Sequence, residues 1–91
     1  GDGSGKGIWI HALSVGEVTS ALPLVKGIRR DKPDAIIVFS AATRTGAHVA
    51  EKRIRPFVDR IIAAPFDLLF SIHRFIRQIR PDLFILIETD F

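Results

Sequence analysis

Four short apolar runs recur along the chain, and apolar positions between them return with helical spacing. The runs cover residues 8–13, 35–39, 60–64 and 83–87. Strands that alternate with helices of roughly 10–15 residues are typical of a parallel sheet with right-handed crossovers. We therefore predict an α/β fold with a parallel, Rossmann-like sheet of about four strands, in the order 3-2-1-4, and three helices.

The start of the first helix is ambiguous in the sequence. Ser14 and Glu17 fit a capping box, in which the serine accepts from the amide three residues on and the glutamate reaches back. That helix would contain Pro23, which removes a backbone N–H and favours a kink. The alternative is a helix that begins near Ser20, with Pro23 in its first turn and Glu17 in the preceding loop. Either helix continues to Arg30.

Capping residues and prolines delimit the two later helices. Thr45 is the predicted N-cap of a helix that runs to about Arg55 and ends before Pro56. Asp67 is the predicted N-cap of the third helix, which ends at Pro81.

The fourth predicted strand, residues 83–87, is apolar on both faces. Such a strand suits the interior of a parallel sheet, yet the predicted order places it at an edge. We therefore expect either that the chain is incomplete or that this edge pairs with a second copy in a homodimer.

Residues 1–7 are glycine-rich and contain a lysine, as phosphate-binding loops do. The spacing differs from that motif, Gly7 replaces its hydroxyl residue, and the stretch precedes a strand instead of following one. We predict a flexible leader or a cloning remnant at residues 1–7, and one partial domain over residues 8–91.

Composition narrows the class of protein. The 91 residues are 47% hydrophobic and 25% charged, with no cysteine and three histidines. These values fit a globular domain and exclude a disulfide framework or a thiolate metal site, and the histidines are too far apart for a zinc site. We expect no cofactor and no metal. No run approaches the roughly 20 apolar residues that span a bilayer, so we expect a soluble, cytoplasmic protein.

The net charge of +3 raises the question of an anionic partner. Solvated helix faces explain most of the basic residues. The next interpretation is a phosphorylated lipid, a membrane surface or nucleic acid, with Phe70, Arg74 and Arg77 as the predicted lipid-facing patch. Nucleic acid is disfavoured because no basic motif with interleaved aromatic residues occurs.

Candidate chemistry follows the first apolar run, where residues 14–17 place one carboxylate in a turn of small residues. In open parallel sheets, ligands bind outside the carboxyl ends of the strands, where such turns lie. Glu17 is therefore the first candidate, although a capping box alone would also explain it. Gly16 either permits a tight turn or, because it lacks a side chain, leaves room for a ligand. Ser14 fits an N-cap better than a nucleophile, and we expect His11 to be a satisfied core histidine.

Five motifs in order resemble those of the 3-deoxy-D-manno-octulosonic acid (Kdo) transferases, bacterial enzymes that add this sugar acid to a lipid A precursor. They are W-I-H-A-L-S-V-G-E at residues 9–17, T-R-T-G at 43–46, P-F-D at 65–67, R-P-D at 80–82 and E-T-D-F at 88–91. The resemblance extends over residues 8–91.

This resemblance implies most of the amino-terminal, acceptor-binding domain of a two-domain GT-B glycosyltransferase. It implies that Glu17 is the general base, which deprotonates the acceptor hydroxyl that attacks CMP-Kdo, and that Glu88 is a second required carboxylate. The acceptor, a lipid A precursor, would be bound by Ser14, Gly16, Thr45 and Gly46. The intact protein would lie on the inner face of the bacterial inner membrane.

Two features depart from the family pattern. Asp90 stands where the family usually has a second glutamate, and neither the following W-P nor the carboxyl-terminal donor domain is present. A GT-B reaction needs both domains around a cleft, so we expect the 91 residues alone to be inactive. The rival hypothesis is a non-catalytic binding or self-association module that dimerises through the fourth strand.

Overall fold

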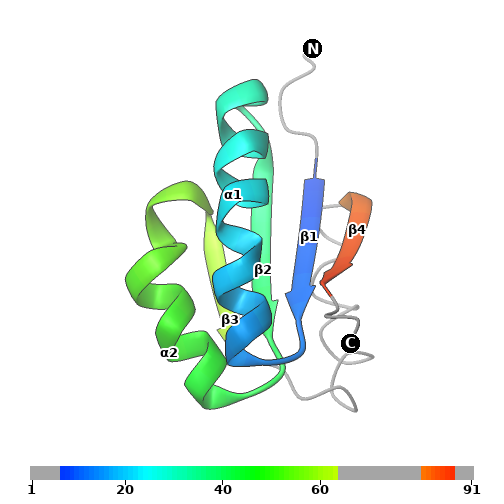
Figure 1. Ribbon diagram of the computed structural model, residues 1–91. Helices are drawn as coiled ribbons and strands as arrows, with labels where there is room; N and C mark the ends of the chain where they lie inside the picture. Colours follow the sequence, from blue (N-terminus) through cyan, green and yellow to red (C-terminus); the bar gives the residue numbers. More distant parts are fainter. Residues whose placement is uncertain (1–6, 64–80, 88–91) are drawn as a thin grey trace.

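The structure of the chain is a computed structural model that describes residues 7–63 and 81–87. Figure 1 shows the elements in chain order. They are strand β1 (Gly7–Ala12), helix α1 (Val15–Asp31), strand β2 (Ile36–Ala41), helix α2 (Arg44–Arg53), the 3₁₀ turn η1 (Arg55–Phe57), strand β3 (Arg60–Ala63) and strand β4 (Pro81–Ile87).

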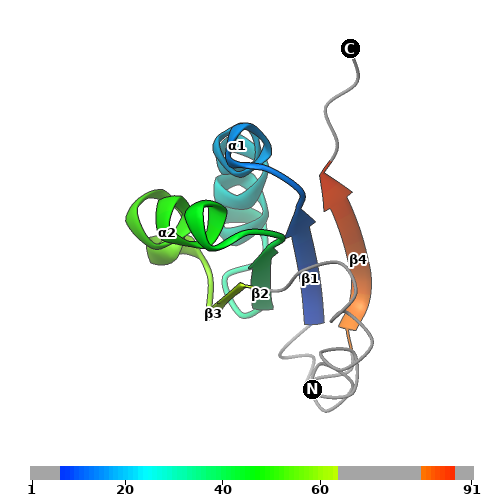
Figure 2. The ribbon, with the colours of Figure 1, turned by 90° about the horizontal axis from the view of Figure 1, so that it is seen from below.

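The described strands form one parallel sheet in the order β3-β2-β1-β4. In this register, Trp9 of β1 lies opposite Val38 of β2 and Phe84 of β4. Helices α1 and α2 lie together on one face of the sheet (Figures 1 and 2). The predicted α/β class with a parallel sheet is therefore confirmed.

Several sequence predictions fall outside the described residues. These are residues 1–6 of the leader predicted at residues 1–7, whose last residue, Gly7, begins β1, together with the third helix and its Asp67 cap, the lipid-facing patch of Phe70, Arg74 and Arg77, and the candidate carboxylate Glu88. They stay predictions. No helix among the residues that the structure describes is long and apolar enough to cross a bilayer.

The core of the described part of the chain lies between the sheet and helices α1 and α2. Alternate side chains of a strand point to opposite faces, so every second residue of β1 and β2 enters this layer. The buried members are Ile8, Ile10 and Ala12 of β1, Ile37, Phe39 and Ala41 of β2, Val18, Ala21 and Val25 of α1, and Ala50 of α2, together with Ala35 and Ile54. This packing fixes which ends of the helices lie beside which ends of the strands.

Helix α1 begins at Val15, directly after its N-cap Ser14, and therefore follows the first of the two predicted starts. Pro23 lies inside the helix and deprives the Thr19 carbonyl of its usual N–H partner. Both residues are exposed, so water can solvate that carbonyl. The helix that begins near Ser20 was the wrong alternative.

Helix α2 corrects the predicted cap. It begins at Arg44 with Thr43 as the N-cap, and the Thr43 hydroxyl accepts a 2.9 Å hydrogen bond from the Gly46 amide. Thr45, the predicted cap, lies in the first turn and is exposed. The motif offers two threonines, and only the first has its hydroxyl three residues before an unpaired amide of the first turn.

Arg29 joins the amino-terminal ends of the strands to the end of α1. Its guanidinium donates to the carbonyls of Phe57, Pro33 and Ala35 at 2.9, 2.9 and 2.8 Å, and to the Asp59 carboxylate at 2.8 Å. The same Asp59 oxygen accepts from the Ile37 amide at 2.7 Å. Arg29 thus satisfies backbone carbonyls in the connection between α1 and β2 and in η1, and pairs with Asp59 before β3.

Candidate functional site

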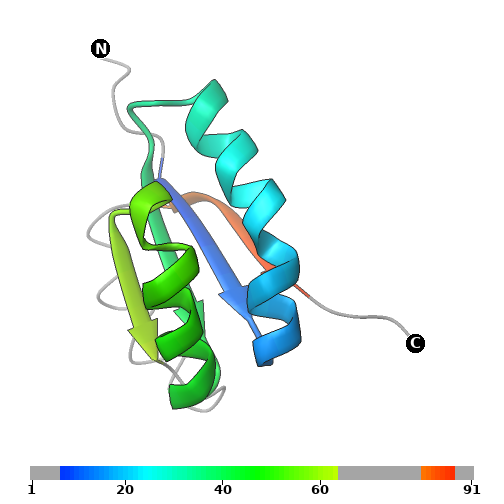
Figure 3. The same ribbon diagram turned by 60° about the vertical axis from the view of Figure 1, so that its left-hand side comes forward.

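The candidate site lies at the carboxyl edge of the sheet, where two helices begin side by side. Strands β1 and β2 both end there, and their helices α1 and α2 start there, at the lower edge of Figure 1 and again in Figure 3. The Ala42 amide donates to the Ala12 carbonyl at 2.9 Å, which joins the two strand–helix connections. The fold therefore brings residues 14–17 and 43–46, about thirty positions apart in sequence, to the same edge.

Glu17 is held at this edge by its own cap. Its side chain is buried, with 8% of the residue exposed. The Ser14 hydroxyl donates to Glu17 Oε1 at 2.6 Å and accepts from the Glu17 amide at 3.3 Å. The predicted capping pair is confirmed, with the glutamate reaching back to the serine hydroxyl. A carboxylate oxygen is consequently fixed in position beside the first turn of α1.

Gly16 is not a turn glycine. It lies in the first turn of α1 and is exposed, and its backbone does not adopt the left-handed conformation that favours glycine. A Cβ added there would meet only Ser14 Oγ, at 3.8 Å. Glycine costs a helix about 1 kcal/mol relative to alanine, and the described contacts supply no structural reason for it. Gly16 therefore leaves open space over the start of α1.

Gly46, in contrast, is required by packing. The residue is buried, and an added Cβ would lie 3.1 Å from Thr43 Oγ1, 3.2 Å from the Ala41 Cβ and 3.5 Å from Val18 Cγ2. Its absence of a side chain lets the first turn of α2 sit directly on the end of β2. Thr45 beside it is exposed, so of the two predicted acceptor-binding residues in α2 Thr45 is the more accessible.

These two glycines give a matched pair of stability tests. Gly46→Ala should lower the free energy of unfolding by about 1–3 kcal/mol, because the new methyl group overpacks the end of β2. Gly16→Ala should leave it unchanged or raise it by up to about 1 kcal/mol, because the methyl group meets only open space in a helix. Urea unfolding of the 91-residue chain measures both. Equal losses of unfolding free energy in the two variants would contradict the inference that Gly46 is tightly packed and Gly16 is not.

His11 belongs to a hydrogen-bonded group on the sheet face opposite α1 and α2. Ser40 Oγ accepts from Trp9 Nε1 at 2.7 Å and lies 2.6 Å from His11 Nδ1. Because an indole N–H can only donate, the serine proton is best placed on the bond to Nδ1, and His11 then carries its own proton on Nε2.

The prediction that His11 is a core residue is confirmed, since none of it is exposed. Within the residues that the structure describes, it is hydrogen-bonded at only one ring nitrogen, because Nε2 is buried and has no hydrogen-bond partner among them. Burial lowers the pKa of His11 below its ordinary value, since the charged form would lose its hydration.

A pH dependence of folding follows from His11. The unfolded chain titrates near the ordinary pKa of 6.5, and the folded chain titrates lower. Below pH 6.5 the unfolded state binds more protons, so the free energy of unfolding falls as the pH falls toward the folded pKa, by at most about 1.4 kcal/mol per pH unit. Above pH 6.5 the full contribution is present. Urea unfolding between about pH 5.5 and 7.5 measures it.

The control variants separate this histidine from another one. His11→Gln should flatten the pH dependence, whereas the same change at the exposed His48 should leave it as in the unchanged chain. An equal slope in the His11 variant and the unchanged chain would contradict the assignment.

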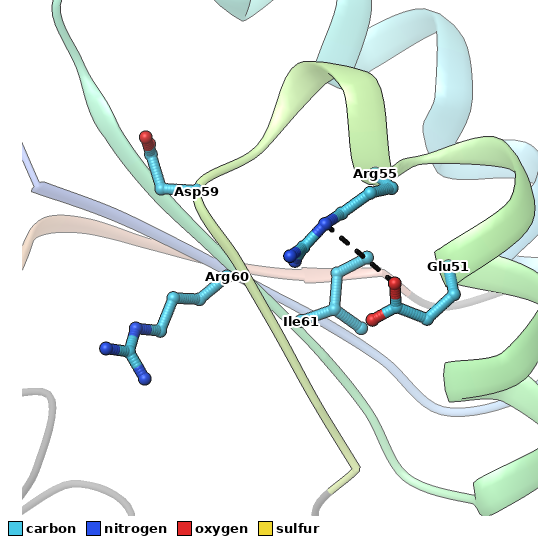
Figure 4. Close-up of a pocket in the computed structure, with 5 residues that line it drawn as sticks. All are labelled: Glu51, Arg55, Asp59, Arg60 and Ile61. Atoms are coloured by element: carbon cyan, nitrogen blue, oxygen red, sulfur yellow. Dashed lines mark ion pairs between the residues drawn. The ribbon is translucent and has the colours of Figure 1, made fainter.

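A hollow of about 440 Å³ opens elsewhere, at the amino-terminal end of β3 (Figure 4). It is lined by Glu51, Arg55, Asp59, Arg60 and Ile61. Arg55 pairs with Glu51 at 3.9 Å, and Asp59 is engaged by Arg29 and the Ile37 amide. These charges serve the fold, and the hollow lies at the opposite end of the strands from Glu17. It is not the candidate site.

The structure thus brings together four of the residues that the sequence singled out: Ser14, Gly16, Thr45 and Gly46 surround the edge at which Glu17 is held. Thr43 is the residue that sequence reasoning missed, and its signal was the spacing of three to Gly46. Among residues 7–63 and 81–87, no cluster of histidine and carboxylate side chains could hold a metal ion.

Comparison with known proteins places this geometry in a family. A family model described as 3-deoxy-D-manno-octulosonic-acid transferase (kdotransferase) matches residues 2–91. The enzyme named 3-deoxy-D-manno-octulosonic acid transferase is 45% identical over 87 residues in Haemophilus influenzae, which is 93% of this chain and 20% of the relative. The protein of that name in Chlamydia muridarum is 33% identical over 88 residues, 97% of this chain and 20% of the relative.

The chain spans about a fifth of the length of these curated relatives. No solved structure gives a significant match. The family model covers nearly the whole chain, including the two strand–helix connections of the candidate site. The chain therefore belongs to the 3-deoxy-D-manno-octulosonic-acid transferase family.

Proposed function

We propose that this chain is the acceptor-binding, amino-terminal part of a GT-B glycosyltransferase that moves Kdo from CMP-Kdo to a lipid A precursor. The observation that carries the proposal is the buried Glu17 carboxylate, held 2.6 Å from the Ser14 hydroxyl at the carboxyl edge of the sheet. Membership of the Kdo transferase family supports the transferase activity.

Glu17 is the proposed general base. Its carboxylate takes the proton from an acceptor hydroxyl as that oxygen bonds to the anomeric carbon of Kdo, and the bond from this carbon to the CMP phosphate oxygen breaks. CMP leaves with the bonding electrons. The hydrogen bond from Ser14 orients the carboxylate, which is what a general base requires before its pKa matters.

The acceptor is proposed to lie over the starts of α1 and α2. Gly16 leaves the first turn of α1 open, and the exposed Thr45 offers a hydroxyl beside it. Ser14 and Gly46 contribute through the caps that shape this edge. Glu88 is proposed as the supporting carboxylate, because it follows β4 in sequence and β4 pairs in parallel with β1. The donor domain of an intact protein would close the cleft.

A chimera tests the proposal. The 91 residues replace the matching fifth of the Haemophilus influenzae relative, to which they are 45% identical, and transfer from CMP-Kdo to a lipid A precursor is followed by mass spectrometry. We expect transfer by the chimera and none by the 91 residues alone. A folded chimera that transfers nothing, beside an active parent enzyme, would contradict the proposal and favour the non-catalytic module.

A further inference from the structure

Three buried polar side chains join β1 to β2 on the sheet face opposite helices α1 and α2. His11 and Ser40 lie opposite each other in the register of the two strands, and each is one residue before the end of its strand. Ser40 Oγ lies 2.6 Å from His11 Nδ1 and accepts from Trp9 Nε1 at 2.7 Å. His11 and Ser40 are fully buried. Side-chain hydrogen bonds therefore link the two strand ends in addition to the backbone pairing.

A buried polar group of this kind is not required for a stable sheet. Polar side chains lose free energy when they leave water, and apolar residues of similar shape are often as stable as a buried hydrogen-bonded pair. On the helix-facing side of the same strand ends, the buried side chains are all apolar, namely Ile10, Ala12, Phe39 and Ala41. What directional hydrogen bonds add is one defined geometry of the groups that they join.

The next two residues of this segment extend the link to both helices. Ala41 faces the helix layer, where its Cβ would lie 3.2 Å from a Cβ added to Gly46, and Val18 Cγ2 would lie 3.5 Å from the same point. The Ala42 amide donates at 2.9 Å to the last carbonyl of β1. Residues 40–42 thus contact β1 and the starts of α1 and α2, which Figure 3 shows side by side. We call residues 40–42 the β2 clamp.

We propose that His11 and Ser40 are positioning residues for the transfer reaction and act on Glu17 through the β2 clamp. Glu17 lies in the first turn of the helix that follows β1, and Thr45 lies in the first turn of the helix that follows β2. The relative position of the two strand ends therefore sets the gap that an acceptor must fill. This inference rests on the proposed function, in which the acceptor lies over both helix starts. Misplacing a reacting group by about 1 Å can lower a rate about a hundredfold.

His11→Leu separates positioning from stability. It removes the acceptor of the Ser40 proton, but it also removes Nε2, which is buried without a hydrogen-bond partner among the described residues. We therefore expect the urea midpoint of the 91-residue chain to stay close to that of the unchanged chain. The kcat of the chimera should fall about ten- to a hundredfold, with little change in KM for the acceptor, because the contacts that bind the acceptor remain. A His11→Leu chimera that transfers as fast as the unchanged chimera would overturn the proposal.

His11→Asn is the matched conservative variant. Its side-chain carbonyl oxygen is as many bonds from Cα as Nδ1 of histidine is, so it can accept from the Ser40 hydroxyl. We expect the chimera with this change to keep a kcat close to that of the unchanged chimera. The smaller side chain leaves a void, so the urea midpoint should fall further than in His11→Leu. A kcat that follows the order of the urea midpoints in the two variants would overturn the proposal.

Ile37→Val is the control for general loosening of the sheet. Ile37 is a fully buried residue of β2 that faces the helix layer, near the strand end remote from Glu17. Loss of one methyl group should lower the urea midpoint and leave kcat unchanged. Equal losses of kcat in Ile37→Val and His11→Leu would overturn the proposal, because they would report the stability of the sheet and not the position of Glu17.

Amide hydrogen exchange of the 91-residue chain tests the β2 clamp without transfer activity. In His11→Leu, the Ala42 amide should exchange about tenfold faster than in the unchanged chain, because the link between the strand ends opens more often. The Ile54 amide, which donates to Ala50 at the far end of α2, should exchange at an unchanged rate. An unchanged rate at Ala42 would overturn the proposal. An unchanged chimera that transfers nothing would instead contradict the proposed function, so the two failures are distinguishable.

Discussion

Replacing Glu17 by glutamine is expected to lower the rate of Kdo transfer by the chimera about 10²- to 10⁴-fold, with little change in KM. Loss of a general base removes an interaction made in the transition state, and effects of this size are typical of such a base. Glutamine keeps the length of the side chain and a carbonyl oxygen that can accept from Ser14 at the position of Glu17 Oε1. The fold should therefore be retained, as circular dichroism and urea unfolding would verify.

Ser14→Ala distinguishes catalysis from capping. It removes the hydroxyl that bonds both the amide and the carboxylate of Glu17, so it should cost about 0.5–2 kcal/mol of stability. Its effect on transfer should be smaller than that of Glu17→Gln, because the carboxylate remains. A Glu17 variant that keeps transfer within tenfold while Ser14→Ala destabilises the chain would show that Glu17 serves only as a helix cap.

Arg29→Met is expected to lower the free energy of unfolding of the 91-residue chain by about 2–4 kcal/mol. The substitution keeps an apolar stem but removes four hydrogen bonds, three of them to backbone carbonyls in two segments, the α1–β2 connection and η1. It also leaves Asp59 without its ion pair. Urea unfolding, with the midpoint and slope fitted together, measures the loss.

The neighbouring Arg30 provides the control for Arg29. It is exposed, and its ion pair with Asp31 is solvated, so Arg30→Met should stay within about 0.5 kcal/mol of the unchanged chain. Arg29→Lys should recover only part of the loss, because a single ammonium cannot reproduce the geometry of the planar fork. Similar losses for Arg29→Met and Arg30→Met would mean that the backbone contacts of Arg29 contribute little.

Much of the fold could be predicted because its signals are local. The apolar runs and the helical spacing between them predict strands and helices through side-chain periodicity alone. The pair of Ser14 and Glu17 predicts a helix start because both partners lie within one turn. Residue order then places the end of β1 beside the end of β2, since parallel neighbours share their carboxyl edge. The position of Glu17 at that edge was thus a prediction from sequence that the structure confirms.

Other features depend on residues that meet only in three dimensions. The Thr43 cap and the need for Gly46 to lack a side chain follow from how α2 sits on Ala41 and Val18. His11 meets Ser40 across 29 positions of sequence, and Arg29 meets Asp59 across 30. Neither Ser40 nor Asp59 carries a local sequence pattern that identifies it as the partner.

The sequence by itself determined the α/β class, the place of the candidate carboxylate and the family to which the chain belongs. Side-chain periodicity and short contiguous motifs are enough to predict these features. Only the tertiary structure decided that Gly16 faces open space at the start of α1 while Gly46 closes a packing contact, and that Arg29 links the end of α1 to the segments before β2 and β3. The physical reason is that burial and hydrogen-bond satisfaction depend on which segments pack together, and local residue patterns do not specify those partners.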